Sequence, residues 1–141
     1  MNIIEEINQR LPTTHLVMHG SSSVPKELVD IINRYGGEIR PTWGVPVHEI
    51  QEGIKHGVRK VNVDTDLRLA ATGAIRKAFA EDPGEFDPRY YLKPARAAMQ
   101  QVVEARMEAF GQAGHAADYD PIPLPDMAVR YKEQGHQLTV T

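Results

Sequence analysis

The sequence predicts an α/β fold made of parallel strand–helix units, and two observations support this prediction. Two apolar runs, 15–18 and 58–63, contain the β-branched and aliphatic residues that buried strands favour. Roughly 40 residues of mainly helical pattern separate the runs, which is typical of a right-handed crossover between parallel strands. Parallel sheets are buried on both faces and need several neighbouring strands, so two strands alone would leave the fold incomplete.

Five stretches carry apolar residues at helical spacing and are bounded by proline or glycine: 2–10, 25–35, 46–56, 67–79 and 94–110. Pro25 and Pro46 are each expected to open a helix, and Ser23 is expected to cap the first of these two. Residues 86–92 are expected to form an irregular, aromatic-rich connector. In the longest helix, the residues expected to face inward are Ala95, Met99, Val102, Val103 and Phe110.

The domain organisation follows from these elements. One domain is expected over 1–141, with the strand–helix units and closing helices in 1–110 and a C-terminal extension in 111–141. Within the extension, residues 127–134 are expected to form a last helical piece. The first helix carries an apolar face without a preceding element to cover it, which predicts that the fold continues upstream; this face consists of Ile3, Ile4, Ile7 and Leu11.

Composition narrows the function classes. The 141 residues carry a net charge of −3 and contain no basic block, which argues against a nucleic-acid partner. No apolar run approaches the roughly 20 residues of a membrane span, and the N-terminus lacks the pattern of a signal peptide. The absence of cysteine fits a reducing compartment. A soluble, cytoplasmic protein with a small-molecule ligand is therefore expected.

Polar clusters follow both expected strands and mark the candidate site. His19–Ser22 and Asn62–Thr65 would lie side by side at the carboxyl ends of neighbouring parallel strands, where α/β folds bind ligands. Gly20 permits close approach of the backbone, the hydroxyl groups add donors, and a following helix offers free N–H groups, a combination that suits phosphate. His19 has the side chain of a common zinc ligand.

Each of these features also has a structural interpretation without function. A single histidine at a strand end is more often hydrogen-bonded than metal-bound, and Gly-Ser-Ser-Ser is often only a loop with a helix cap. Asp64-Thr65-Asp66 is a common capping sequence, and Arg89 reads as a solvated surface residue. Pattern alone leaves an α/β unit with a candidate anion site.

Three segments together resemble class II fructose-bisphosphate aldolase, with the Calvin-cycle subtype as the closest branch: Leu-Val-Met-His-Gly-Ser-Ser-Ser-Val-Pro at 16–25, Gly-Ile-Lys-His-Gly-Val at 53–58 and Lys-Val-Asn-Val-Asp-Thr-Asp-Leu-Arg at 60–68. Phe-Asp-Pro-Arg at 86–89 and the tail after Phe110 fit the same family. The resemblance runs from residue 2 to at least 130.

This resemblance implies a (β/α)8 barrel, which needs roughly 250 residues. Residues 16–18 would be its seventh strand and 58–63 its eighth, with 2–10 as the helix after the sixth. The chain would thus supply the last two βα units, the C-terminal helices and the tail of an incomplete TIM barrel.

The resemblance also implies a reaction, the reversible cleavage of fructose 1,6-bisphosphate to dihydroxyacetone phosphate and glyceraldehyde 3-phosphate. A zinc ion would act as the Lewis acid, with His19 as one ligand, and a monovalent cation is a further cofactor that the resemblance implies. Asn62 would contact the substrate near the reacting carbons, and Arg89 would reach the second phosphate across a dimer interface. The implied substrate-binding residues are Gly20, Ser21, Ser22, Asn62, Val63, Asp64, Thr65 and Arg89.

The other zinc histidines, the aspartate that serves as general acid and base, and an acidic residue on a mobile loop would lie upstream of this sequence. One histidine does not hold a catalytic zinc, since three protein ligands are usual. We therefore expect the chain to be inactive alone. Two alternatives stay open at this point: a non-catalytic module for phospho-ligand binding or assembly, and a C-terminal half that works beside an upstream polypeptide.

Overall fold

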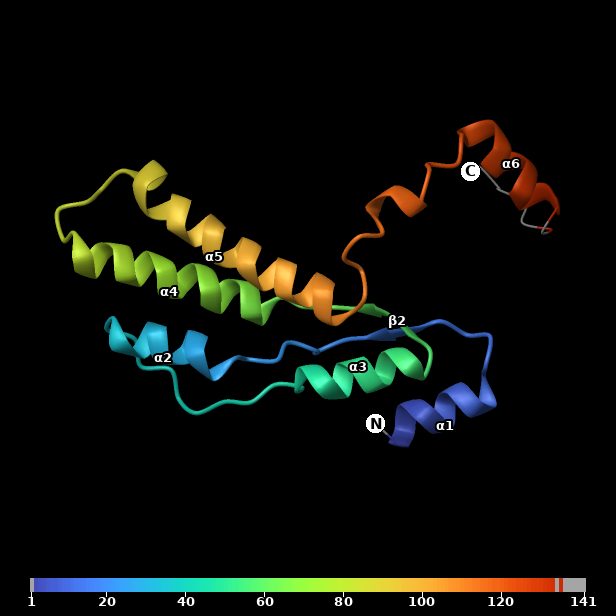
Figure 1. Cartoon of the computed structure of the whole chain (residues 1–141), viewed down its shortest axis with the longest axis horizontal. Coiled ribbons are helices and arrows are strands. Elements are labelled where there is room, and N and C mark those ends of the chain that lie inside the picture. Colours follow the sequence, from blue (N-terminus) through green and yellow to red (C-terminus); the bar gives the residue numbers. More distant parts are fainter. Residues whose placement is uncertain (1, 134, 136–141) are drawn as a thin grey trace, which may run out of the picture. The chain divides into compact units, whose positions relative to one another are not determined.

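The computed structural model describes residues 2–133 and 135, which fall into two compact units divided after Gly111. The first unit contains two strands and five helices (Figure 1). In chain order they are α1 (Asn2–Arg10), β1 (Leu16–Met18), α2 (Lys26–Arg34), α3 (Val47–Lys55), β2 (Val58–Val61), α4 (Thr65–Glu81) and α5 (Pro88–Ala109). The second unit contains a short 3-10 helix, η1 (Ala116–Asp118), and α6 (Leu124–Glu133).

The two strands form a parallel sheet, as the sequence predicts. Leu16 pairs with Val58 and Met18 with Val61, with an irregularity of register after Leu16. The backbone N–H of Asn62 donates to Met18 O at 3.0 Å, so pairing continues one residue beyond the end of β2. The expected strand 58–63 is therefore too long, because the chain turns after Asn62 to begin α4.

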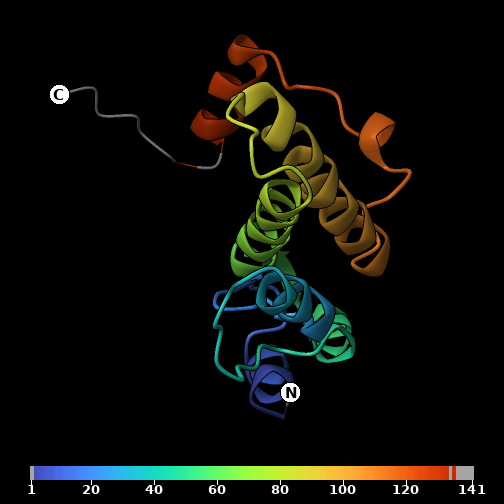
Figure 2. The same cartoon turned by 90° about the vertical axis from the view of Figure 1, so that its left-hand side faces the viewer.

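The core of this unit lies where the strands meet the helices that follow them. Ile32 of α2, Ile50 of α3 and Val58 of β2 are almost completely buried. α4 packs against both α2 and α5 (Figure 1 and Figure 2). Gly73 permits the close approach of α2, because a Cβ at this position would lie 3.0 Å from Ile31 Cγ2. These helices hold the ends of the strands in place.

The long C-terminal helix of this unit begins earlier than the sequence analysis predicts. α5 starts at Pro88, so most of the expected irregular connector is helical. Asp87 is its N-cap and accepts a hydrogen bond from the backbone N–H of Arg89 at 2.9 Å. Pro94 lies inside the helix, although it was expected to open it. An N-cap aspartate followed by proline is the stronger start signal, and it outweighs the later proline.

Ser23 does not cap α2. The N-cap position is Pro25, and no side chain caps this helix end. The backbone N–H of Ser23 instead donates to Asp66 at 3.1 Å, which links this segment to α4. The expected cap is wrong because a contact distant in sequence fixes the segment before α2.

Apolar side chains of both α1 and α5 are exposed. α1 has the predicted bounds and no buried residue, and Ile3 is 75% exposed, as expected for an apolar face that no preceding element covers. In α5, Ala95 is buried as expected, whereas Met99 and Val103 remain more than a third exposed. Phe79 and Tyr91 contact one another across α4 and α5, with ring centroids 4.8 Å apart. Part of the apolar surface of this unit thus has no partner within the described residues.

The second unit is a short segment of helical turns. α6 begins three residues before the expected helix 127–134, and residue 134 lies outside the described residues. Neither of its helices contains a buried residue. Over the described chain, no helix combines the length and apolar character that a membrane crossing requires.

Candidate functional site

The candidate site lies at the carboxyl ends of β1 and β2. Parallel pairing of the two strands places His19 next to Asn62, and His19 Nδ1 lies 2.7 Å from Asn62 Nδ2. An amide nitrogen only donates, so the two side chains form a hydrogen bond when Nδ1 of His19 carries no proton. Both residues leave some surface open to solvent. The sequence prediction that these two polar clusters meet is confirmed.

Ser22 joins the segment after β1 to the start of α4. Its hydroxyl oxygen accepts the backbone N–H of Asp64 at 3.2 Å and that of Thr65 at 3.0 Å. Asp64 is the N-cap residue of α4, but its own side chain makes no cap bond. Ser22 therefore satisfies the helix N-terminus from more than 40 residues away. The expectation of free N–H groups at this helix end is therefore wrong for Thr65, whose N–H is already bonded to Ser22.

The hydroxyl of Ser22 can still donate one hydrogen bond to a ligand. A serine oxygen that accepts two N–H bonds still has its own hydrogen to donate. Because its acceptor side is engaged by a helix N-terminus, that hydrogen is polarised towards a negatively charged partner. Ser22 can thus transmit the positive end of the α4 dipole to an anion.

Two glycines shape the segment after β1. Gly20 adopts φ +65°, and a Cβ at this position would meet no atom within 4 Å, so backbone conformation and open space both suit a ligand here. Gly44 packs closely against the same segment, because a Cβ on it would fall 2.0 Å from Ser22 O. Val45 N–H also donates to Ser22 O at 3.0 Å. The loop before α3 therefore packs against the backbone of Ser22.

Other predicted site residues lie around these strand ends in different environments. Ser21 is fully buried, and its hydroxyl has no hydrogen-bond partner among the described residues. Val63 is half-buried, while Asp64 and Thr65 are exposed. The carboxylate of Asp64 pairs with Arg68 one turn along α4, at 2.8 and 2.9 Å. Ser21 is enclosed in this structure, so neither its hydroxyl nor its backbone reaches solvent.

Arg89 lies in the first turn of α5, and its side chain bonds to Asp87 rather than to residues at the strand ends. Its Nε lies 3.0 Å from both carboxylate oxygens of Asp87, and its side chain is 91% exposed. Hydrogen bonds from the Arg89 side chain, and then from its backbone N–H, lower the pKa of Asp87. The same pairing raises the pKa of Arg89. In this structure Arg89 is an exposed, charged side chain.

Asp66 is a residue of the site region to which the sequence analysis gave only a capping role. It is fully buried, and it accepts hydrogen bonds from Val24 N–H at 2.8 Å and Ser23 N–H at 3.1 Å. Arg106 of α5 completes the set at 2.9 Å. Asp64-Thr65-Asp66 reads locally as a capping sequence, and no local signal pairs Asp66 with a residue 40 positions away.

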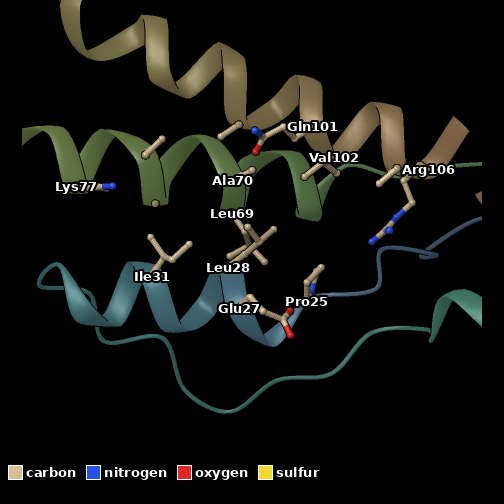
Figure 3. A pocket seen from close by; sticks show the side chains of 14 residues that line it. Pro25, Glu27, Leu28, Ile31, Leu69, Ala70, Lys77, Gln101, Val102 and Arg106 are labelled. Carbon is tan, nitrogen blue, oxygen red and sulfur yellow. The ribbon is translucent and has the colours of Figure 1, made fainter. Parts of the chain in front are cut away.

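An apolar groove lies elsewhere on the unit. It runs between α2, α4 and α5, has a volume of about 390 Å³, and is lined by side chains such as Leu28, Leu69 and Val102 (Figure 3). None of the predicted site residues lines it. The polar chemistry therefore gathers at the strand ends and not in this groove.

The described residues do not complete a metal site. Among them there is no group of three or more histidine, cysteine, aspartate or glutamate side chains that could hold a metal ion. His19 is thus a single candidate ligand, and its Nδ1 is occupied by Asn62. A zinc ion does not fit the residues present here by themselves.

Comparison with known proteins decides the family. The model of the family described as "Fructose-bisphosphate aldolase class-II" matches residues 1–115. The chain belongs to the class II fructose-bisphosphate aldolase family. Among curated relatives, the fructose-bisphosphate aldolase of Stutzerimonas stutzeri is 63% identical over 128 residues, which are 91% of this chain and 36% of that protein.

Two further relatives give the same result. The fructose-bisphosphate aldolase of Pseudomonas aeruginosa is 62% identical over 128 residues, and that of Rhizobium meliloti is 58% identical over 131 residues. The alignments cover 91% and 93% of this chain, but 36% of each relative. The chain thus spans about a third of the length of the curated relatives it matches.

Class II aldolases are carbon–carbon lyases that generally depend on zinc, and their fold is a TIM barrel. The expected family and fold are confirmed. The described residues form two strand–helix units of such a fold and no closed barrel. The roles of individual site residues stay predictions.

Proposed function

We propose that this chain provides the ketose-phosphate side of a class II aldolase active site. The reaction would be the reversible cleavage of fructose 1,6-bisphosphate to dihydroxyacetone phosphate and glyceraldehyde 3-phosphate. The observation that carries the proposal is Ser22, whose hydroxyl bridges the segment after β1 and the first residues of α4. Family membership and relatives named fructose-bisphosphate aldolase support the same reaction.

The phosphate would bind over the N-terminus of α4. Ser22 and Thr65 offer hydroxyl donors, and Gly20 would let its own backbone approach the phosphate closely. The aligned peptide dipoles of a helix favour an anion at its N-terminus, an effect of roughly 0.3–1 kcal/mol at an exposed site. Asp64 is already paired with Arg68, so its charge opposes the phosphate less than a free carboxylate would.

Asn62 would act on the reacting part of the substrate. Its amide contacts His19, and it would lie beside the proposed phosphate site because β1 and β2 pair in parallel. A donor here gains strength as negative charge develops on the substrate oxygens, which is the kind of contact that lowers a reaction barrier. Asn62 would also fix the orientation of the His19 ring.

The metal chemistry needs residues that the described chain does not contain. Zinc would supply Lewis-acid polarisation of the ketone in a complete family member, and His19 would be one of its ligands. Because no set of three ligands forms among the described residues, we derive no catalytic step through the metal from this chain. The monovalent cation that the resemblance implies stays a prediction.

Arg89 would contact the second phosphate from a neighbouring subunit of a homo-oligomer. In this structure it pairs with Asp87, so substrate binding would exchange one anionic partner for another. A planar guanidinium makes forked contacts with carboxylate and phosphate alike, which makes such an exchange chemically reasonable. A cytoplasmic location suits this small-molecule reaction and the cysteine-free sequence.

A second candidate function is phospho-ligand binding without catalysis by this chain. The observation that favours it is that Ser22 contacts the first residues of α4, where we propose that the phosphate binds, while His19 is the single candidate metal ligand among the described residues. The general acid and base of the family would also lie outside this sequence. We therefore propose that the 141 residues bind the ketose phosphate but do not cleave fructose 1,6-bisphosphate by themselves.

Calorimetric titration of the chain with dihydroxyacetone phosphate and with dihydroxyacetone tests the proposal. We expect binding of the phosphate ester only, weakened at least about tenfold by Ser22→Ala, because a lost charge-assisted hydrogen bond is worth roughly 1.5–3 kcal/mol. Thr72→Ala, which removes an exposed hydroxyl further along α4, is the matched control and should bind normally. Equal binding of both ligands, or no binding, would refute the phosphate site.

An assay of aldol cleavage with added zinc separates the two candidate functions. We expect no turnover by the isolated chain, while a full-length relative assayed alongside serves as the positive control. Turnover that disappears in Ser22→Ala and His19→Ala would show that the chain is itself a complete enzyme.

A further inference from the structure

Asp66 is the only carboxylate that is fully buried among the described residues, and the proposed reaction gives it no chemical role. A buried carboxylate needs hydrogen-bond partners to offset the loss of its hydration. Its partners come from two other parts of the chain, the segment before α2 and the helix α5. These partners place Asp66 where it joins the residues next to Ser22 to α5.

Each oxygen of Asp66 holds a defined group. Oδ1 accepts Val24 N–H at 2.8 Å, while Oδ2 accepts Ser23 N–H at 3.1 Å and an N–H of Arg106 at 2.9 Å. Figure 3 shows Arg106 extending from α5 towards the chain at Pro25. The guanidinium is largely buried, with 16% of the side chain exposed. Asp66 thus connects α4, the segment before α2 and α5.

Val24 adopts a backbone conformation that needs such support. Its φ is +49°, and it is the only residue other than glycine with positive φ in the described part of the chain. β-branched residues rarely enter this region, and they stay there only when the surroundings fix them. The bond from Val24 N–H to Asp66 is a direct restraint on this conformation.

The same two segments are joined a second time by Ser22. The start of α4 donates two N–H groups to Ser22 Oγ, through Asp64 and Thr65, and Asp66 then accepts two N–H groups from the residues after Ser22. The start of α4 therefore donates to the segment before α2 and also accepts hydrogen bonds from it. Movement of Ser23 and Val24 would move Ser22, because the three are adjacent in the chain.

We propose that Asp66, oriented by Arg106, is the positioning residue that holds Ser22 over the N-terminus of α4, so that phosphate affinity depends on a contact made by α5. The identity of the ligand rests on the proposed function. The contacts of Asp66 with Ser23, Val24 and Arg106, called the clamp below, rest on geometry alone. A merely structural ion pair would behave differently. Its loss would lower the stability of the whole unit and leave the affinity of the remaining folded molecules unchanged.

Amide hydrogen exchange of the full chain without ligand tests the clamp. We expect Asp66→Asn to accelerate exchange at Ser23 and Val24 at least tenfold, and at Asp64 and Thr65 as well, while Ile50 in α3 stays protected. Asp30→Asn is the matched control, since Asp30 is an exposed partner of Lys26 on α2. Unchanged exchange at Ser23 and Val24, or an equal increase throughout the unit, would overturn the proposal.

Titration with dihydroxyacetone phosphate tests the consequence for binding. Per folded molecule, we expect Asp66→Asn to weaken binding at least tenfold, Arg106→Gln to weaken it several-fold, and Arg106→Lys, which keeps a cationic donor, to recover part of that loss. Unchanged affinity in Asp66→Asn despite faster exchange would overturn the positioning role.

The Arg106 variants keep the test decisive if Asp66→Asn does not fold. In that case both the exchange at Ser23 and the affinity should follow the order wild type, Arg106→Lys, Arg106→Gln; any other order contradicts the proposal. If the wild-type chain binds no dihydroxyacetone phosphate, the proposed function fails, while the exchange experiment still decides whether the clamp exists.

Discussion

The hydroxyl oxygen of Ser22 lies 3.0 Å from the backbone nitrogen of Thr65, although 43 positions separate the two residues in the sequence. This contact brings together the two polar clusters that follow β1 and β2. It also supplies the helix N-terminus with a cap that the adjacent Asp64 side chain does not provide. One hydroxyl thus links fold stability to the candidate ligand site.

Loss of that hydroxyl should destabilise the fold. Substitution of a capping serine by alanine costs roughly 0.5–2 kcal/mol, so we expect Ser22→Ala to lower the free energy of unfolding by about 1 kcal/mol. Urea unfolding followed by circular dichroism measures the effect. Thr72→Ala, on an exposed face of α4, should be neutral or slightly stabilising because alanine favours helix. Equal effects of the two substitutions would argue against a capping role for Ser22.

Packing behind Ser22 should be intolerant of added volume. A Cβ on Gly44 would approach Ser22 O to 2.0 Å, so Gly44→Ala requires a backbone shift and should cost roughly 1–3 kcal/mol of stability. Gly84→Ala is a useful comparison because its Cβ would meet only an Asp82 oxygen at 3.6 Å. A Gly44→Ala variant as stable as Gly84→Ala would show that the loop before α3 does not support Ser22.

Asn62 should matter for turnover more than for substrate affinity. In a full-length family member carrying these residues, we expect Asn62→Ala to reduce kcat by roughly a hundredfold, since removal of one donor that stabilises developing charge costs about 3 kcal/mol. Steady-state kinetics with fructose 1,6-bisphosphate separates the two parameters. A raised KM with unchanged kcat would mean that Asn62 only holds the ground state.

Arg89 should discriminate between ligands with one and two phosphates. In a full-length enzyme, we expect Arg89→Ala to weaken fructose 1,6-bisphosphate roughly ten- to a hundredfold and to leave dihydroxyacetone phosphate nearly unaffected. Arg89→Lys should recover only part, because an ammonium cannot form a forked contact. Arg96→Ala, at an exposed position of the same helix, is the control. Equal weakening of the binding of both ligands would show that Arg89 does not contact the second phosphate.

Zinc affinity should be low in the isolated chain. Because His19 is the one residue with an expected ligand role, we expect binding no tighter than that of a single imidazole, and little change in His19→Ala. Calorimetric titration with zinc measures this. A single strong site that disappears in His19→Ala would show that the chain completes a metal centre on its own.

Local signals made much of the fold predictable. The bounds of α1 and the starts of α2 and α3 follow from proline, glycine and apolar spacing that lie within a few residues of each helix end. The predicted start of α5 is wrong because the sequence has two prolines, Pro88 and Pro94, that could each open a helix. Pro88 preceded by Asp87 carries both a cap and an N1 proline, whereas Pro94 lacks the cap.

The candidate site was predictable only in part, for a physical reason. That His19 meets Asn62 follows from parallel pairing, which the spacing of the two apolar runs indicates. The partners of Asp66 depend instead on how α5 packs against α4, and no period of the sequence encodes a contact between residues 40 positions apart. The exposure of Met99 and Val103 likewise reflects tertiary surroundings and not the apolar spacing of α5.

The most direct test of this account is a map of amide chemical shifts in the 141-residue chain during titration with dihydroxyacetone phosphate. If the phosphate binds over the N-terminus of α4, the largest changes will occur at Gly20, Ser22, Asp64 and Thr65, saturate with one dissociation constant, and be absent with dihydroxyacetone. Shifts centred on the groove between α2, α4 and α5, or no saturable shifts at the strand ends, would contradict it.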